Sequence, residues 1–283
     1  MTHRACLAGV TVGDDLDVAI IGVLNVSPES FYQGSVVRES DVLVRAAEGM
    51  ARAGAAILDV GAMSTAPYLA TRIAAEEEAD RLCSAIAVLR DKVDLPISAD
   101  TSRRLPARAA LEAGARIIND VTGLRADAEL GPLVAQAGAG LIAMASERDD
   151  GVGARPIEVV LGLLRESLEL ARRAGVPEDT IVLDPGIGFF REQGVSWYDW
   201  DCQVLSRLER LRALGRPLCL AVSRKSFVGA LTGEQDPARR LPGSLAATAA
   251  AVLAGAQLIR THDVPETMQA VKVASAIRRA RDR

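Results

Sequence analysis

Aromatic residues, cysteines and histidines are all scarce in this sequence. Aromatic side chains account for 3% of the 283 residues, whereas hydrophobic residues make up 49%, so aliphatic residues must build the core, as they do in barrels with Val/Ile/Leu interiors. The cysteines lack CxxC or metal-ligand spacing, which argues against a disulfide framework or a zinc motif and predicts reduced thiols in a cytoplasmic protein. There are four of them: Cys6, Cys83, Cys202 and Cys219.

An excess of charge of one sign and long apolar runs are absent as well. The 33 basic and 37 acidic residues are interspersed and give a formal net charge of −4, so the sequence has no electrostatic footprint for nucleic acid. The opening residues MTHRACLAG lack the apolar stretch of a signal peptide, and no run approaches the ~20 apolar residues of a membrane span. We therefore expect neither nucleic acid nor membrane among the partners.

What the sequence does contain is a regular alternation of short aliphatic runs and helical segments. A (β/α)8 barrel typically takes ~250 residues, which suits a chain without a linker-like stretch or a shift in composition. We predict an α/β fold, a (β/α)8 TIM barrel, in a single domain over residues 1–283 with its core at about 17–280. The expected strands are 20–26, 56–65, 95–101, 116–121, 140–145, 181–189, 218–226 and 258–264. The expected helices are 40–54, 74–93, 104–115, 126–139, 156–175, 202–215, 243–256 and 265–283.

Polar residues end almost every one of these aliphatic runs. A buried strand has no structural use for an ionisable group, since an unpaired buried charge costs several kcal/mol or shifts its pKa. Its recurrence indicates a parallel sheet whose carboxyl ends share one polar site. The residues at these ends are Asn25, Asp59, Asp100, Asn119, Asp184, Lys225, Arg260 and His262. For Asp59, and for Asp120, the favoured interpretation is that the carboxylate only caps a loop or a strand end.

Two long irregular stretches are expected at 26–40 and 189–201, each following a strand. Barrel enzymes carry their catalytic loops on this face. The second stretch contains both tryptophans. Aromatic residues this rare, placed in loops, indicate either a lid or platform for an aromatic substrate or simple packing of the loops on the barrel rim.

Eight motifs in order along the chain resemble those of the dihydropteroate synthases, the pterin-binding barrel family. They are GVLNVSPESF, DVGAMSTAP, ISADTSR, AALEAGARIINDVTG, LDPGIGF, AVSRKSFVGAL, GSLAAT and IRTHDVPET. The resemblance implies a cytoplasmic transferase that joins 6-hydroxymethyl-dihydropterin pyrophosphate to p-aminobenzoate and releases pyrophosphate, with Mg²⁺ as cofactor, in folate biosynthesis. It also implies a homodimer whose other partners are the pterin pyrophosphate and the arylamine.

The resemblance assigns roles to the polar strand ends. A carboxylate accepts two adjacent N–H groups of a pterin in one charge-assisted bidentate contact. The residues implied for the pterin are Asp100, Asn119, Met144, Asp184 and Lys225. Those implied for pyrophosphate are Asn25, Arg260 and His262, with Asn25 also at the metal, and the implied catalytic residues are Lys225, Arg260 and His262. The implied arylamine contacts are Thr65, Pro67, Phe189, Ser223 and Ser226.

Departures from the family pattern fall on the acceptor side. Ala66 stands where the family has arginine, IAMAS replaces the Met-His-Met segment, and FFREQGVSWYDW lies where the family has Gly-Lys after LDPGIGF. A similar GAMSTAPY loop occurs in methanopterin-type relatives, which favours a larger, phosphate-bearing arylamine with Arg72, Arg148 and Arg191 as its partners. Two alternatives stay open: a methyltransferase from a reduced pterin to a corrinoid protein, and a non-catalytic pterin-binding relative.

Overall fold

Eight parallel strands form a ring, as the alternating pattern predicts. The computed structural model describes residues 3–26, 36–63, 73–147, 155–191 and 194–281. The barrel strands are β3 (Ala19–Asn25), β4 (Ile57–Gly61), β5 (Ile97–Asp100), β6 (Ile117–Asp120), β7 (Gly140–Met144), β8 (Ile181–Asp184), β9 (Cys219–Leu220) and β10 (Leu258–Thr261). They are hydrogen-bonded in the order β8-β7-β6-β5-β4-β3-β10-β9, and a parallel bridge between Leu183 and Leu218 joins the two ends of the sheet. The predicted (β/α)8 TIM barrel is thereby confirmed.

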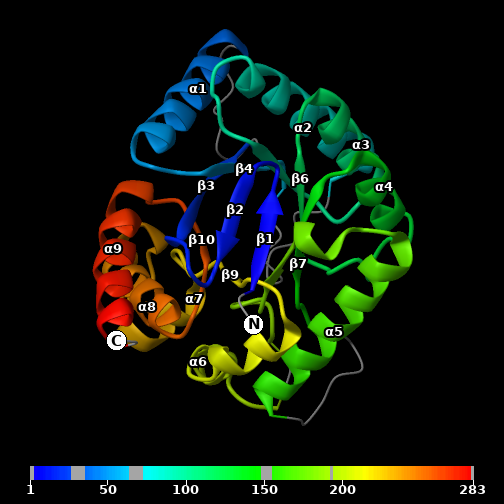
Figure 1. Ribbon diagram of the computed structural model, residues 1–283. Helices are drawn as coiled ribbons and strands as arrows, with labels where there is room; N and C mark the ends of the chain where they lie inside the picture. The colour runs from blue at the N-terminus through cyan, green and yellow to red at the C-terminus, as the bar shows by residue number, and fades with distance from the viewer. Residues whose placement is uncertain (1–2, 27–35, 64–72, 148–154, 192–193, 282–283) are drawn as a thin grey trace.

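Helices follow each strand and surround the ring (Figure 1). They are α1 (Val36–Arg52), α2 (Ala75–Arg90), α3 (Arg104–Ala113), α4 (Leu130–Ala137), α5 (Pro156–Ala174), α6 (Trp197–Leu205), α7 (Ser226–Thr232), α8 (Leu241–Leu253) and α9 (Val264–Arg281), with 3-10 helices η1 (Glu178–Thr180), η2 (Leu208–Leu214) and η3 (Pro237–Arg239). Local sequence explains such bounds: α5 starts at Pro156, and the chain leaves it through Gly175 at a left-handed φ of 83°. Among the described residues, no helix is long and apolar enough to cross a membrane.

A β-hairpin made of β1 (Arg4–Leu7) and β2 (Val10–Gly13) covers the amino-terminal end of the barrel. Figure 1 shows it lying across the centre of the ring. Its buried residues Ala5, Leu7 and Val12 pack against inward-facing residues of the strands, which we call the lower layer. The lower layer consists of Ile21, Ile57, Ile117, Ile142, Val182, Cys219 and Leu258. The hairpin thus adds buried residues ahead of the core predicted from about residue 17, where strands this short leave little periodicity to detect.

The stretch 189–201, expected to be irregular, contains the first turn of α6. Trp200, Asp201 and Val204 are buried on one face of this helix, at the spacing of an amphipathic helix. Trp200 is 1% exposed and stacks on Phe190 with ring centroids 4.9 Å apart. This tryptophan therefore packs the loop onto the barrel. The helix expected at 202–215 is the end of α6 followed by η2.

Other predicted bounds shift by a few residues. Helix α4 begins at Leu130 and not at 126, because residues before it form a turn in which Asp127 accepts from the backbone of Glu129. Its internal Gly131 is required by packing, since a Cβ there would lie 2.8 Å from Ala174 Cβ on α5. Helix α1 begins at Val36, inside the stretch 26–40 expected to be irregular, and the expected strand 218–226 is reduced to β9.

Candidate active site

Four neighbouring strands present their ends at one level. Asn25 of β3 is in register with Gly61 of β4, Gly61 with Asp100 of β5, and Asp100 with Asn119 of β6. A Cβ on Gly61 would lie 3.4 Å from Asn25 Oδ1 and 3.8 Å from Asp100 Oδ2. The missing side chain at Gly61 thus leaves room between a residue implied for pyrophosphate and one implied for the pterin.

The Arg260 guanidinium joins two buried carboxylates at this end of the barrel. Its Nε donates to Asp59 Oδ2 at 2.6 Å, and its Nη2 donates to Asp100 Oδ2 at 2.8 Å. Asn119 Nδ2 also donates to Asp59 Oδ2, at 3.1 Å. Because the fully buried Asp59 binds side chains from two other strands, its interpretation as a cap was wrong. Sequence reasoning missed its place at the centre of the site.

Two carboxylate oxygens of this network, Asp59 Oδ1 and Asp100 Oδ1, are buried without a hydrogen-bond partner among the described residues. Buried polar atoms are nearly always bonded, so such an atom calls for an explanation such as a ligand. Burial raises the pKa of Asp100 to about 7, with the Arg260 charge opposing this shift and the Asp59 charge adding to it. Near neutral pH, Asp100 can therefore either accept or donate a hydrogen bond.

Asp184 ends β8 in register with Met144 of β7, and both side chains are buried. Its Oδ1 accepts from the Gly186 backbone N–H at 2.7 Å. Burial raises the pKa of Asp184 to about 6, while that hydrogen bond and the Lys225 charge oppose the shift. At neutral pH Asp184 is mainly an ionised acceptor beside an apolar thioether, which suits a flat ring with N–H groups on its edge.

Lys225 reaches the same end from the turn between β9 and α7. Its Nζ lies 4.5 Å from the centroid of the Phe189 ring, a cation–π contact. Its stem packs on Gly188, where a Cβ would lie 3.1 Å from Lys225 Cδ. Burial lowers the pKa of Lys225 to about 8, although the Asp184 charge opposes the shift. Lys225 is therefore mainly protonated at neutral pH.

Arg224 fixes the turn that carries Lys225. Its backbone adopts φ 56°, which is uncommon for a residue with a side chain. Its backbone N–H donates to Ser244 Oγ at 2.8 Å, and its Nε donates to Asp263 at 3.0 Å. Arg240 donates to the Arg224 carbonyl at 3.2 Å. Contacts with η3–α8 and with the start of α9 thus stabilise the turn.

His262 lies next to this turn and bonds Ser223 twice. Ser223 Oγ is 3.0 Å from His262 Nδ1 and accepts from the His262 backbone N–H at 3.3 Å. The pKa of His262 is lowered to about 4, first by desolvation and then by the positive charges of Arg260 and Arg224. His262 is therefore a neutral imidazole at physiological pH and offers a hydrogen bond, whereas Arg260 offers a charge.

The acceptor-side residues Phe189, Ser223 and Ser226 gather around Lys225. Ser226 Oγ accepts from Arg191 Nη2 at 2.7 Å, and Arg191 Cζ lies 4.2 Å from the Trp197 ring centroid. A cation therefore lies beside the serine implied for the arylamine. The other acceptor-side positions lie outside the described residues: Thr65, Ala66, Pro67, Arg72 and Arg148.

Two further carboxylates are buried near these loops. Asp120 caps its loop as expected, accepting from the backbone N–H groups of Thr122 and Leu124. Asp201 accepts from the Gly188 backbone N–H at 2.8 Å, and sequence reasoning missed it. The signal was present, since an acid on the apolar face of the helical pattern Trp197-Trp200-Val204 indicates a buried carboxylate and not a solvated charge.

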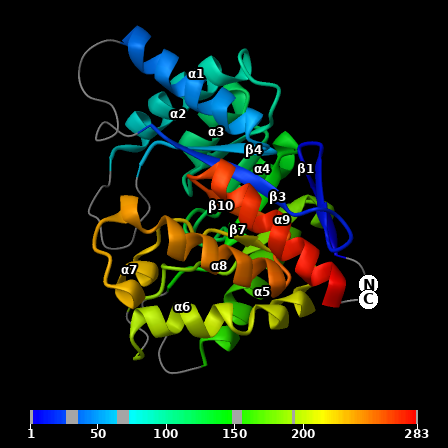
Figure 2. The ribbon, with the colours of Figure 1, turned by 90° about the vertical axis from the view of Figure 1, so that its left-hand side faces the viewer.

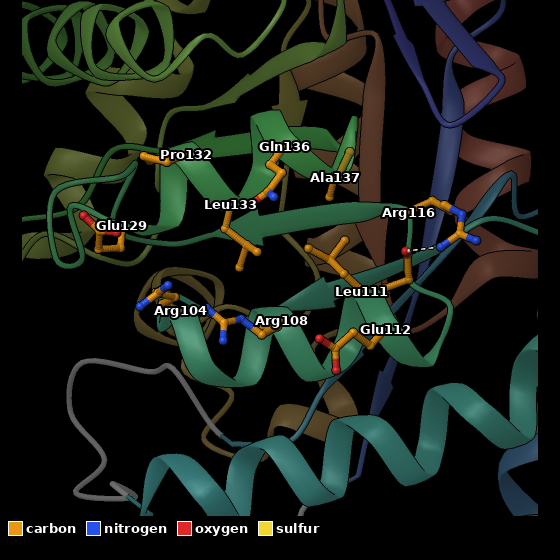
Figure 3. Close-up of a pocket in the computed structure, with 12 residues that line it drawn as sticks. Arg104, Arg108, Leu111, Glu112, Arg116, Glu129, Pro132, Leu133, Gln136 and Ala137 are labelled. Carbon is orange, nitrogen blue, oxygen red and sulfur yellow. Dashed lines mark hydrogen bonds between the residues drawn. The ribbon is translucent and has the colours of Figure 1, made fainter.

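A groove of about 620 Å³ lies outside the barrel, between α3 and α4 (Figure 3). Its charged lining residues are exposed and of both signs: Arg104, Arg108, Glu112, Arg116 and Glu129. None of the polar strand ends lines this groove. The chemistry described above is therefore separate from it.

Comparison with known proteins gives the family. The pterin binding enzyme family matches residues 21–262. The chain belongs to this family. The dihydropteroate synthase of Synechocystis sp. is 35% identical over 266 residues, which cover 91% of this chain and 89% of that protein. The Xanthomonas albilineans dihydropteroate synthase solved with 4-aminobenzoic acid has a TM-score of 0.87 at 33% identity, covering 98% of each chain. The complex of that enzyme with 7,8-dihydropteroate has a TM-score of 0.84 at 33% identity, covering 97% of this chain and 98% of that one.

As a member of the pterin-binding enzyme family, the chain is a transferase of the dihydropteroate synthase type. The strand-end residues singled out in its sequence do meet at one end of the barrel. Asp59, Asp100, Asn119 and Arg260 form one bonded network. Lys225 lies within electrostatic reach of Asp184 and Arg260.

Proposed function

We propose that this chain condenses 6-hydroxymethyl-dihydropterin pyrophosphate with an arylamine at the polar end of its barrel. The amine nitrogen attacks the pterin methylene carbon, the carbon–oxygen bond to pyrophosphate breaks, and the nitrogen then loses a proton. The buried network of Arg260, Asp59 and Asp100 carries this proposal. The network combines carboxylate oxygens that have no hydrogen-bond donor among the described residues with a cation held in place by the carboxylates. It lies inside the region that matches the pterin-binding family.

The pterin binds between Asp184 and Asp100. The ionised Asp184 accepts from the two adjacent N–H groups of the aminopyrimidinone edge, and Asp100 Oδ1 and Asn119 bind the remaining polar ring atoms. Lys225 donates to the pterin carbonyl or to a ring nitrogen, and Met144 packs on the ring. This pattern uses the unpaired oxygen of Asp100, whose burial without a ligand is otherwise costly.

The departing pyrophosphate lies toward Arg260, His262 and Asn25. Two nitrogens of Arg260 bond Asp59 and Asp100, so Nη1 is the group that remains for a phosphate oxygen, and the neutral His262 adds a hydrogen bond. Within the described residues no three His, Cys, Asp or Glu side chains cluster as a metal site. Mg²⁺, which keeps few protein ligands in phosphate sites, would therefore bind Asn25 Oδ1 and pyrophosphate oxygens and neutralise leaving-group charge.

The arylamine enters beside Phe189 and Ser226. A benzoate carboxylate at this place meets the Ser226 hydroxyl and the Arg191 guanidinium, which already contact each other. p-Aminobenzoate is the simplest such acceptor. A larger, phosphate-bearing arylamine of the methanopterin type is the second candidate, favoured by the cation that Arg191 places on the acceptor side.

Pyrophosphate release from the pterin pyrophosphate, measured against a panel of arylamines, tests the proposal. The expected result is stoichiometric pyrophosphate and pteroate-type product, lost in the Asp184→Ala variant. Methyl transfer to a corrinoid protein, or tight pterin binding without turnover, would contradict it. The ratio of kcat/KM for p-aminobenzoate to that for a phosphate-bearing arylamine separates the two acceptors.

We also propose a cytoplasmic homodimer formed through α8 and α9, which lie side by side in Figure 2. An apolar hollow of about 400 Å³ lies between them, and Val273 and Ile277 are 63% and 54% exposed at its edge. Exposed apolar patches of this kind mark association surfaces. Sedimentation should give a dimer for the wild-type chain and a monomer for Val273→Glu/Ile277→Glu. A wild-type monomer at all concentrations would overturn the assignment.

A further inference from the structure

Asp201 is a buried charged side chain to which the proposed reaction gives no role. It is 1% exposed, and its Oδ1 accepts from the Gly188 backbone N–H at 2.8 Å. Its Oδ2 is buried without a partner among the described residues. Since an isolated buried carboxylate is costly, its position behind the site calls for a compensating gain.

The Gly188–Phe189 segment is the wall against which Lys225 lies. Gly188 has φ 86°, and a Cβ at this position would lie 3.1 Å from Lys225 Cδ and 3.6 Å from its Nζ. The next residue, Phe189, places its ring 4.5 Å from the same Nζ. Asp201 holds this segment through the Gly188 N–H, its only hydrogen bond among the described residues.

The charges around Lys225 come from four elements. Asp184 on β8, Asp100 on β5 and Asp201 on α6 favour its protonated form, whereas Arg260 on β10 opposes it, as does burial. Around Asp201, Lys225 and Arg191 favour the ionised form, while burial raises the pKa of Asp201 to about 6. At neutral pH Asp201 is therefore mainly ionised and counters the cost of burying the Lys225 ammonium.

We propose that Asp201 is a positioning residue for Lys225: through Gly188 it fixes the wall against the lysine stem, and its charge keeps the buried ammonium protonated. This inference rests on the proposed role of Lys225 in the reaction. It goes further by assigning a function to a helix whose sequence departs from the family pattern.

The Asp201→Asn variant separates charge from hydrogen bonding, since the amide oxygen still accepts from Gly188. We expect its kcat at pH 7 to stay within about threefold of the wild-type value, while the basic midpoint of the pH profile falls by on the order of one pH unit. An unchanged basic midpoint would overturn the charge role. Asp120→Asn, which alters a buried carboxylate in another loop, is the matched control and should leave the midpoint in place.

Gly188→Ala tests the wall without altering the charge, and it serves even if Asp201→Asn fails to fold. The added methyl displaces the lysine stem, so kcat is expected to fall at least tenfold with the basic midpoint unchanged. Wild-type kcat in Gly188→Ala would overturn the positioning role. Lys225→Gln separates failure of the proposed function from failure of the inference about Asp201. If that variant keeps full activity, the proposed role of Lys225 itself is wrong, whatever the Asp201 variants show.

Discussion

The two ends of the barrel interior are made by the same strands and have opposite chemistry. Four of the strands contribute a lower apolar residue and, two positions later, an upper polar one on the same face, because side chains alternate along a strand. The pairs are Ile57 and Asp59, Ile117 and Asn119, Val182 and Asp184, and Leu258 and Arg260. A step of two residues along a strand therefore separates packing from chemistry.

The lower end matters to the upper one because it is dry. The inward-facing hairpin residues Ala5, Leu7 and Val12 and the lower layer are fully or almost fully buried, so the carboxylates above them lie on an apolar floor. In such surroundings charges interact strongly and ionised groups are poorly solvated. Burial is the main cause of the raised pKa values of Asp100 and Asp184 and of the lowered pKa of Lys225.

Arg260→Ala should give the largest loss of stability at the upper end. It leaves Asp59 and Asp100 as buried carboxylates without their cation, which typically costs about 3–5 kcal/mol. The double variant Asp59→Ala/Arg260→Ala should lose less than the sum of the two single variants, by about 1–3 kcal/mol. Denaturant unfolding of the four proteins measures both quantities. Strict additivity would mean that the ion pair has no energetic weight.

Ile117→Ala should lower the free energy of unfolding by about 2–5 kcal/mol, because it opens a cavity in the lower layer. The affinity of the folded protein for a pterin analogue should not change. Unfolding curves and calorimetric titration give the two numbers. Val42→Ala, at a 51% exposed position on α1, is the control, expected within about 0.5 kcal/mol of the wild type. A parallel loss of affinity would show that the two layers are not independent.

Asp184→Ala should reverse this pattern. We expect about a hundredfold weaker binding of a pterin analogue, since charge-assisted hydrogen bonds contribute roughly 1.5–3 kcal/mol each, with the barrel still folded. Val182→Ala, two residues earlier on the same strand and face, should lose stability and keep affinity. The assignment of Asp184 fails if titration shows equal affinities for Asp184→Ala and the wild type.

The smallest expected effect concerns pH. Burial raises the folded-state pKa of Asp184 from 3.8 to about 6, so between these values the folded state holds a proton that the unfolded state has released. Its contribution to stability is fully present below about pH 3.8 and is lost as the pH rises to about 6. In Asp184→Asn, the slope of the unfolding free energy against pH across this window should become less negative, by an amount equivalent to at most one proton. Asp17→Asn, at a highly exposed position, is the control.

The sequence was sufficient to predict the barrel and the residues at its polar end. Long aliphatic runs that end in Asp100, Asn119 or Asp184 leave few alternatives, because a charge inside such a run must be at a strand end. What it could not predict was the bonding between them. The contacts of Arg260 with Asp59 and Asp100 span 201 and 160 residues and depend on strand register, which alternation alone does not determine.

Short or mixed elements were the ones misread. The strands of the hairpin have four residues each, too few to show a period, and their partners are distant in the sequence. Helix α6 combines Trp197, Trp200 and the buried Asp201 in its first turns, so its composition resembles a loop although its spacing is helical. In both cases tertiary packing, which local patterns do not encode, determines the structure.

The hairpin also determines from which end a ligand reaches the barrel interior. Ala5, Leu7 and Val12 close the lower end, so a ligand that rests on Asp184 must enter and leave through the mouth at the carboxyl ends of the strands. In the proposed arrangement the arylamine lies above the pterin, on the side of Ser226, and blocks that opening. This arrangement would impose an order of binding, with the pterin first and the amine second. An amine that cannot react would then hold the pterin in the barrel.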